Sequence, residues 1–86
     1  MPGWEREGDT IRRTYEIRYH AAVAAIVTIA DRSRRVQHHA DLDLRMNTLT
    51  ARITTHDSGY VLTALDVDLA HRIDAIVAAH QALPLD

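Results

Sequence analysis

The stretch Thr10–Arg35, TIRRTYEIRYHAAVAAIVTIADRSRR, changes from one periodicity to another, and this change decides the fold class. As far as Tyr19 the apolar and polar residues alternate, which predicts a strand with one buried face. Arg13 is the one charged residue on that apolar face. From about His20 onward the stretch is Ala-rich and ends in basic residues, which predicts an α-helix. Its apolar residues at helical spacing are Val23, Ile26, Val27 and Ala30.

Strand signals stand on both sides of this stretch. Before it, Gly8 and Asp9 can turn the chain, so Trp4–Glu7 is predicted to be a short partner strand in a hairpin. After it, Asp41–Met46 alternates weakly and predicts another strand. Asn47–Thr55 alternates strongly and is rich in β-branched residues, which favours a strand with one buried face. The pattern therefore predicts four strands.

A second helix follows a break at Ser58 and Gly59. Thr63 begins it, because Asp66 stands three residues later as a capping carboxylate, and Pro84 ends the ordered chain. Residues at spacings of three and four follow, namely Leu62, Leu65, Leu69, Ile73, Ile76, Val77 and His80. The order strand, strand, helix, strand, strand, helix predicts an α+β fold with a four-stranded antiparallel sheet. We expect both helices on one face of the sheet, in one domain spanning residues 1–86.

The composition argues against several classes of protein. The chain has 86 residues and no Cys, so it has no disulfide and no thiolate metal site, and its core is small. The net charge of -2 argues against a nucleic-acid-binding surface. No apolar run approaches the roughly 20 residues of a membrane span, and the N-terminus is charged rather than signal-like. We expect a cytoplasmic protein that binds neither nucleic acid nor membrane.

Three of the six histidines lie in one short block: His38, His39 and His56. The unperturbed pKa of histidine is close to neutral, so such a cluster can donate and accept protons at working pH. Two other interpretations stay open. The adjacent pair can be surface residues without a function, or the three imidazoles can ligate zinc. Adjacent histidines on one loop rarely chelate one ion well, so we expect no metal site.

The histidine pair after the first helix and two further motifs carry a resemblance to a known family. Thr54–Asp57 is Thr-Thr-His-Asp at the end of the strong strand, and Leu62–Asp66 is Leu-Thr-Ala-Leu-Asp at the start of the last helix. With the order of elements, these motifs resemble pterin-4a-carbinolamine dehydratase, a family that includes the dimerisation cofactor of a homeodomain transcription factor. The resemblance covers about Trp4–Ala79.

The resemblance implies a reaction and the residues that perform it. The reaction is dehydration of a 4a-hydroxytetrahydropterin to a quinonoid dihydropterin and water, in pterin cofactor recycling, with no metal or redox cofactor. One group protonates the departing hydroxyl and another takes a proton from the ring nitrogen, and histidines suit both roles. We expect His38 and His56 to be the proton-transfer pair, with His39 assisting. The residues expected to bind the substrate are Thr55, Asp57 and Asp66. A helix-capping role for Asp66 is equally open.

Three residues depart from the pattern of the family. Arg34 stands where the family has an acidic residue, Ala40 replaces the Pro of His-His-Pro, and Met46 replaces an aromatic residue. The lost Pro removes a fixed φ beside the histidine pair, and Met offers no flat surface on which a pterin can stack. These changes favour an alternative function, a catalytically inactive dehydratase-like scaffold such as a RuBisCO assembly factor.

The resemblance also implies self-association. It implies that two sheets join edge to edge into one eight-stranded sheet, and that helices can pair these dimers into a tetramer. The free edges of a four-stranded sheet and the small core fit this expectation, because unpaired strand edges are usually covered. We expect a homodimer, with a tetramer as the next step of assembly.

Overall fold

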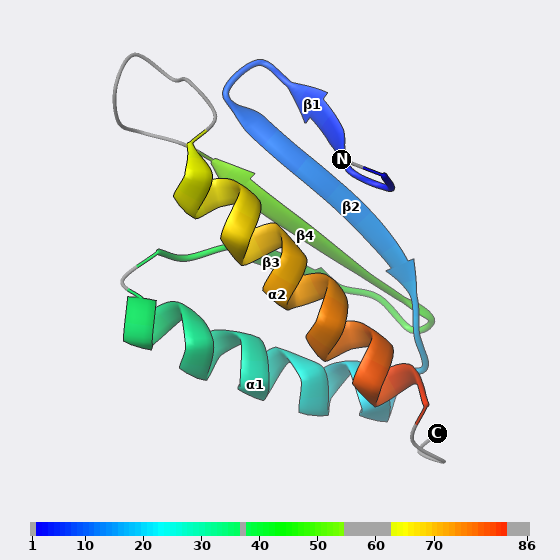
Figure 1. Cartoon of the computed structure of the whole chain (residues 1–86). Helices are drawn as coiled ribbons and strands as arrows, with labels where there is room; N and C mark the ends of the chain where they lie inside the picture. The colour runs from blue at the N-terminus through cyan, green and yellow to red at the C-terminus, as the bar shows by residue number, and fades with distance from the viewer. Residues whose placement is uncertain (1, 37, 55–62, 83–86) are drawn as a thin grey trace.

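The computed structural model describes residues 2–36, 38–54 and 63–82, and it confirms the predicted order of elements and the α+β class. Figure 1 shows one sheet with both helices on the same face. Within the described ranges, neither helix combines the length and the apolar character needed to cross a membrane. The elements are β1 (Glu5–Glu7), β2 (Thr10–Glu16), α1 (Tyr19–Val36), β3 (Asp41–Leu44), β4 (Thr48–Thr54) and α2 (Ala64–Gln81).

The sheet is antiparallel throughout, with the strand order β1-β2-β4-β3. The predicted hairpin is present, since Glu7 pairs with Thr10 across the Gly8-Asp9 turn. Gly8 has a φ of 60°, a left-handed conformation that glycine adopts without a steric penalty. Strands β2 and β4, with seven residues each, form the centre of the sheet. The shorter strands β1 and β3 form its two edges.

The two faces of the sheet differ as the alternation predicts. The face under the helices is apolar and buried, with Ile11, Tyr15, Leu49, Ala51 and Ile53 in the core. The open face carries a row of charged residues in cross-strand register, one from each strand: Glu5, Arg12, Arg52 and Asp41. The two arginines are neighbours in this row, and an acidic residue flanks each of them on its outer side. The charges of the row therefore balance, and the row is not a basic patch.

Strand β2 ends earlier than the sequence predicts. Tyr19 was expected at the end of the strand, but it lies in the first turn of α1 and is 46% exposed. This prediction was wrong because pairing stops where β4 begins, at the partners Glu16 and Thr48. Beyond Glu16, β4 offers no further residue for β2 to pair with. Ile17 is still buried, and its backbone N–H donates to the carbonyl of Asn47 at 3.1 Å before the chain turns into α1.

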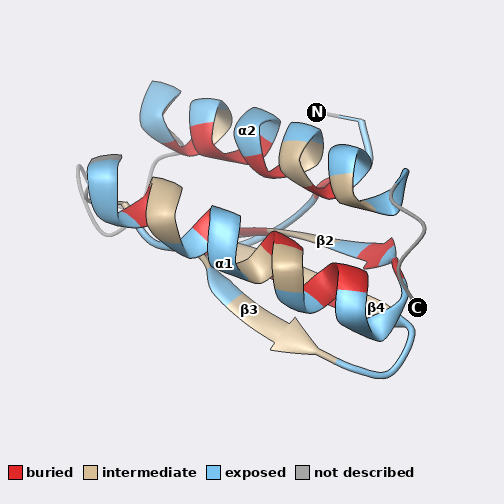
Figure 2. Cartoon of the chain, turned by 90° about the horizontal axis from the view of Figure 1, so that it is seen from below, coloured by how far each residue is buried: buried red, intermediate tan, exposed pale blue. Residues whose placement is uncertain are grey.

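The buried face of α1 is lined mainly by small side chains. Val23 and Val27, which were at helical spacing, are 39% and 65% exposed, and Ala30 is exposed as well. Small residues let α1 approach the sheet and α2 closely, so the helix turns its Ala-rich stripe inward and its valines outward. Figure 2 shows this separation of buried and exposed positions on both helices. The buried residues of α1 are Ala21, Ala22, Ala25, Ile29 and Ser33, and Ile26 packs at the edge of the core.

Among the described residues, helix α2 packs through the apolar residues predicted for it except Leu65, and Leu62 lies outside the described residues. Leu65 was expected at a core-facing spacing, but it is 64% exposed. The reason lies in its neighbour, because Asp66 is fully buried in the first turn and a helix turns successive side chains by about 100°. An inward Asp66 therefore points Leu65 away from the core. The residues of α2 that enter the core are Leu69, Ala70, Ile73 and Val77, with Ile76 at its edge.

Candidate active site

Two regions that are distant in sequence, the end of α1 with the segment that follows it and the start of α2, meet at one end of the molecule. The first region runs from the last turn of α1 to the start of β3, and β4 ends at the same side (Figure 1). His38 lies in the segment between α1 and β3, so the fold places this histidine where the two helices approach the edge of the sheet.

His38 is held at both its backbone and its side chain. Its backbone N–H donates to the carbonyl oxygen of Ser33 near the end of α1, with an N···O distance of 3.1 Å. Its Nε2 lies 2.6 Å from Oδ1 of Asp66 in the first turn of α2. The His38 side chain keeps 23% of its surface exposed, whereas the Asp66 side chain has 0% exposed. His38 therefore joins the end of one helix to the start of the other and remains accessible to solvent.

The Asp66 carboxylate completes a capping box at the start of α2, which confirms its predicted capping role. Its Oδ2 accepts hydrogen bonds from the backbone N–H of Thr63 at 2.9 Å and from the Thr63 hydroxyl at 3.0 Å. Burial on its own raises the pKa of this carboxyl, but the hydrogen bonds from Thr63 and His38 outweigh burial and hold the pKa below its usual value. Asp66 is therefore an anion at neutral pH.

Of the other predicted site residues, one is described by the structure and three are not. His39 is exposed beside His38. Thr55, His56 and Asp57 fall outside the described ranges, directly after the end of β4 at Thr54. The structure thus brings together His38 and Asp66. Within residues 2–36, 38–54 and 63–82, no group of three His, Cys, Asp or Glu side chains is placed to hold a metal ion.

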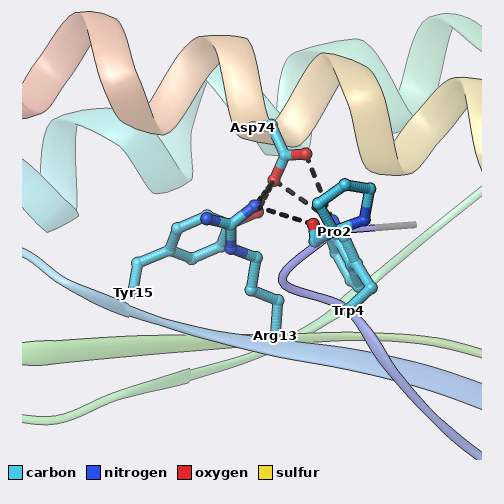
Figure 3. Close-up of polar contacts among 5 residues, drawn as sticks. All are labelled: Pro2, Trp4, Arg13, Tyr15 and Asp74. Carbon is cyan, nitrogen blue, oxygen red and sulfur yellow. Dashed lines mark hydrogen bonds and ion pairs between the residues drawn. The ribbon is translucent and has the colours of Figure 1, made fainter.

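A second polar group, here called the Asp74 cluster, consists of Trp4, Arg13, Tyr15 and Asp74 (Figure 3). Oδ1 of Asp74 accepts hydrogen bonds from the Tyr15 hydroxyl at 2.6 Å, from Nη1 of Arg13 at 3.0 Å and from Nε1 of Trp4 at 3.1 Å. The cluster was not predicted. A signal for it was present, because a charged residue on the apolar face of a strand requires a partner, and Arg13 is such a residue. Asp74 is eight residues from Asp66, or about 12 Å along α2, so the cluster is separate from the His38 site.

Comparison with known sequences decides the family. The sequence profile described as pterin 4 alpha carbinolamine dehydratase matches residues 1–76. The chain belongs to the pterin 4 alpha carbinolamine dehydratase family. This result confirms the resemblance drawn from the histidine pair and the Thr-Thr-His-Asp motif, and with it the prediction of a dehydratase-like lyase.

Similar family members occur in bacteria. A Streptomyces avermitilis protein, provisionally named pterin-4-alpha-carbinolamine dehydratase, is 39% identical over 83 residues, which are 95% of this chain and 82% of the relative. A Nocardia farcinica protein with the same provisional name is 40% identical over 77 residues, which are 88% of this chain and 80% of the relative. The match therefore extends over most of each protein.

Two solved structures share the fold. The crystal structure of a transcriptional coactivator/pterin dehydratase from Brucella melitensis superposes with a TM-score of 0.79 at 22% identity, covering 90% of this chain and 84% of that chain. A pterin dehydratase-like protein identified as a RuBisCO assembly factor in the alpha-carboxysome superposes with a TM-score of 0.71 at 13% identity, covering 86% of each chain. At these identities the likeness shows a common fold.

The structure also places the three departures from the dehydratase pattern. Arg34 is exposed, and its Nη2 lies 3.1 Å from Oδ1 of Asp31, so its charge is paired on the surface of α1. Hydrogen bonds from Arg34 and its neighbour Arg35 lower the pKa of Asp31. Met46 is 76% exposed in the turn after β3, whereas His38 precedes that strand. Ala40 packs against the core. The bonds of His38 to Ser33 and Asp66 hold this histidine in place without the missing proline.

Proposed function

We propose that this chain dehydrates a 4a-hydroxytetrahydropterin to a quinonoid dihydropterin and water. The observation that supports this most is His38, whose accessible imidazole is held by a buried carboxylate in a chain of the dehydratase family. A histidine that is oriented in this way and still reaches solvent can transfer a proton to or from a bound ligand. The reaction needs such groups, because it breaks one C–O bond and moves two protons.

His38 and His56 form the proposed proton-transfer pair. One of them, as an imidazolium, gives a proton to the hydroxyl at the 4a carbon, and the hydroxyl departs as water. The other, as a neutral imidazole, takes the proton from the ring nitrogen, so that the ring closes its new C=N bond. One proton is given and one is taken, so the total charge of the pair is unchanged, and exchange with solvent returns each histidine to its starting protonation state. His39 assists, and Thr55 and Asp57 orient the ligand.

Purified protein is expected to speed the disappearance of the 4a-carbinolamine signal, and a metal chelator is expected not to change the rate. His56→Ala is expected to lower the rate by roughly 10²–10⁴-fold, the contribution of a well-placed acid or base. The circular dichroism of this variant is expected to match that of the wild type. His71→Ala is the matched control, because His71 is an exposed histidine on α2 outside the site. It is expected to keep full activity.

A scaffold function is the second candidate. It is supported by Arg34, Ala40 and Met46, which replace three residues of the dehydratase pattern, and by the fold shared with the RuBisCO assembly factor. A wild-type protein that does not exceed the uncatalysed rate would favour this scaffold over the enzyme. A nearby aromatic amino acid hydroxylase gene supports pterin recycling, whereas a carboxysome operon supports assembly.

The setting of this function is also part of the proposal. We place the protein in the cytoplasm, with a pterin as its small-molecule partner and with no nucleic acid or membrane partner. We further propose that the chain self-associates into a homodimer and that dimers pair into a tetramer. Edge strands β1 and β3 and the outward valines of α1 support these two contacts.

A further inference from the structure

We propose that Asp66 is a positioning residue for His38. It holds the neutral imidazole in the tautomer that is protonated at Nε2, so that Nδ1 is the nitrogen that exchanges a proton with the substrate. This inference rests on the proposed dehydratase function and assigns a task to each of the two ring nitrogens.

The burial of Asp66 separates it from any ligand. Its side chain has 0% exposed surface, and hydrogen bonds occupy both of its carboxylate oxygens. Oδ2 is taken by the backbone N–H and the hydroxyl of Thr63, and Oδ1 is taken by His38. Asp66 therefore reaches the surface only through its partners, and His38 is the partner that can transfer a proton, which favours an indirect role over the expected contact with substrate.

The chemistry of the pair determines which ring nitrogen carries the proton. An ionised carboxylate only accepts hydrogen bonds, and the hydrogen bonds that lower the pKa of Asp66 keep it ionised at neutral pH. With 2.6 Å between Nε2 and Oδ1, Nε2 must be the donor. A neutral imidazole has one donor and one acceptor nitrogen, so Nδ1 carries the free lone pair. Among the described residues, the hydrogen bond of the His38 ring is the one from Nε2 to Asp66, and 23% of the side-chain surface is exposed.

The capping box makes the two oxygens of Asp66 inequivalent. The backbone N–H of Thr63 can only donate, so an oxygen must stay at the Oδ2 position. An asparagine in place of Asp66 is therefore expected to leave its amide oxygen on Thr63 and to turn its amide NH₂ toward His38. Facing a donor, Nε2 of His38 must become an acceptor, and the proton must move to Nδ1. Asp66→Asn is thus expected to invert the tautomer while keeping the shape of the side chain.

The test is to record the ring-nitrogen signals of His38 by ¹⁵N NMR in the free protein, at a pH above the ordinary histidine pKa of about 6.5. His38→Gln identifies the His38 signals among those of the six histidines. The wild type is expected to be protonated at Nε2, and Asp66→Asn at Nδ1. Thr63→Ala is the matched control, because it removes the hydroxyl of the cap and leaves the carboxylate beside His38. It is expected to lower the melting temperature and to keep the wild-type tautomer.

Steady-state kinetics supply a second readout. In Asp66→Asn we expect kcat to fall by roughly 10²-fold, the lower end of what a positioned acid or base contributes, with KM unchanged. A wild-type His38 protonated at Nδ1, or a tautomer that stays the same in Asp66→Asn, would overturn the inference. If Asp66→Asn does not fold, the wild-type tautomer alone decides. Because the NMR measurement needs no substrate, an inactive wild-type protein would count against the dehydratase function and leave the tautomer assignment to be judged separately.

Discussion

The fold strongly raises the pKa of the Tyr15 hydroxyl. Its ring is buried in the core, with 6% of the residue exposed, and its hydroxyl donates to Asp74 at 2.6 Å. Burial raises the pKa of this hydroxyl, and the hydrogen bond to the Asp74 carboxylate raises it further. The folded state therefore keeps Tyr15 protonated at a pH where the unfolded chain, with a pKa of about 10, already ionises.

This difference predicts a loss of stability in alkali. Above about pH 10 the folded state binds one proton more than the unfolded state, so the contribution of Tyr15 is complete below that pH and falls as the pH rises. At neutral pH, Tyr15→Phe is expected to lower the free energy of unfolding by about 2 kcal/mol, because it removes a hydrogen bond to a charged group. Urea unfolding at increasing pH is expected to show this gap closing. Tyr19→Phe, which removes an exposed hydroxyl, is the control and should track the wild type at every pH; a Tyr15→Phe gap that stays constant would contradict the prediction.

At the scale of elements, the Asp74 cluster ties the segment before β1 to the middle of α2. Asp74→Ala leaves the Tyr15 hydroxyl and the Trp4 indole N–H without their acceptor, so we expect the free energy of unfolding to fall by at least about 2 kcal/mol. Asp68→Ala breaks an exposed ion pair with Arg72 on the same helix and is expected to cost less than about 0.5 kcal/mol. Urea unfolding curves measure both. Equal losses in the two variants would show that the cluster adds nothing beyond an ordinary surface pair.

Local sequence patterns predicted the strands and helices well, but they did not predict the contacts between residues that are distant in sequence. Alternation and helical spacing were sufficient for the order of strands and helices, and the three-residue spacing from Thr63 to Asp66 was sufficient for the capping box. The inward face of α1 was not predictable from the sizes of its side chains, since close approach to α2 selected its alanines instead of Val23 and Val27. In the same way, the bond between His38 and Asp66 spans 28 positions and depends on how two helix ends meet.

At the scale of the whole molecule, the edges of the sheet and the outer surface of α1 bear on assembly. Val27 is 65% exposed and Val23 39% exposed on α1, and short strands form both sheet edges. We expect light scattering at micromolar concentration to give at least twice the 9.7 kDa of one chain. If helix contacts pair the dimers, Val27→Glu should reduce a tetramer to a dimer, because it places a charge in an apolar contact.

Thr28→Glu is the control for this assembly, since Thr28 is an exposed neighbour of Val27 one step around the helix. It is expected to leave the oligomer intact. A species of 9.7 kDa for the wild type would refute self-association, whereas a tetramer that survives Val27→Glu would refute only the part assigned to α1.

The hydrogen bond between Trp4 and Asp74 has a consequence for how the chain matures on the ribosome. The two residues are 70 positions apart, so at roughly 5–20 residues per second the indole emerges roughly 4–14 seconds before its acceptor. During that interval β2 also waits for β4, its central partner. The N-terminal part of the nascent domain cannot complete its fold by itself, and the domain folds fully only after α2 has left the exit tunnel. Trp4 is the single tryptophan of the chain, so its fluorescence marks the moment of closure.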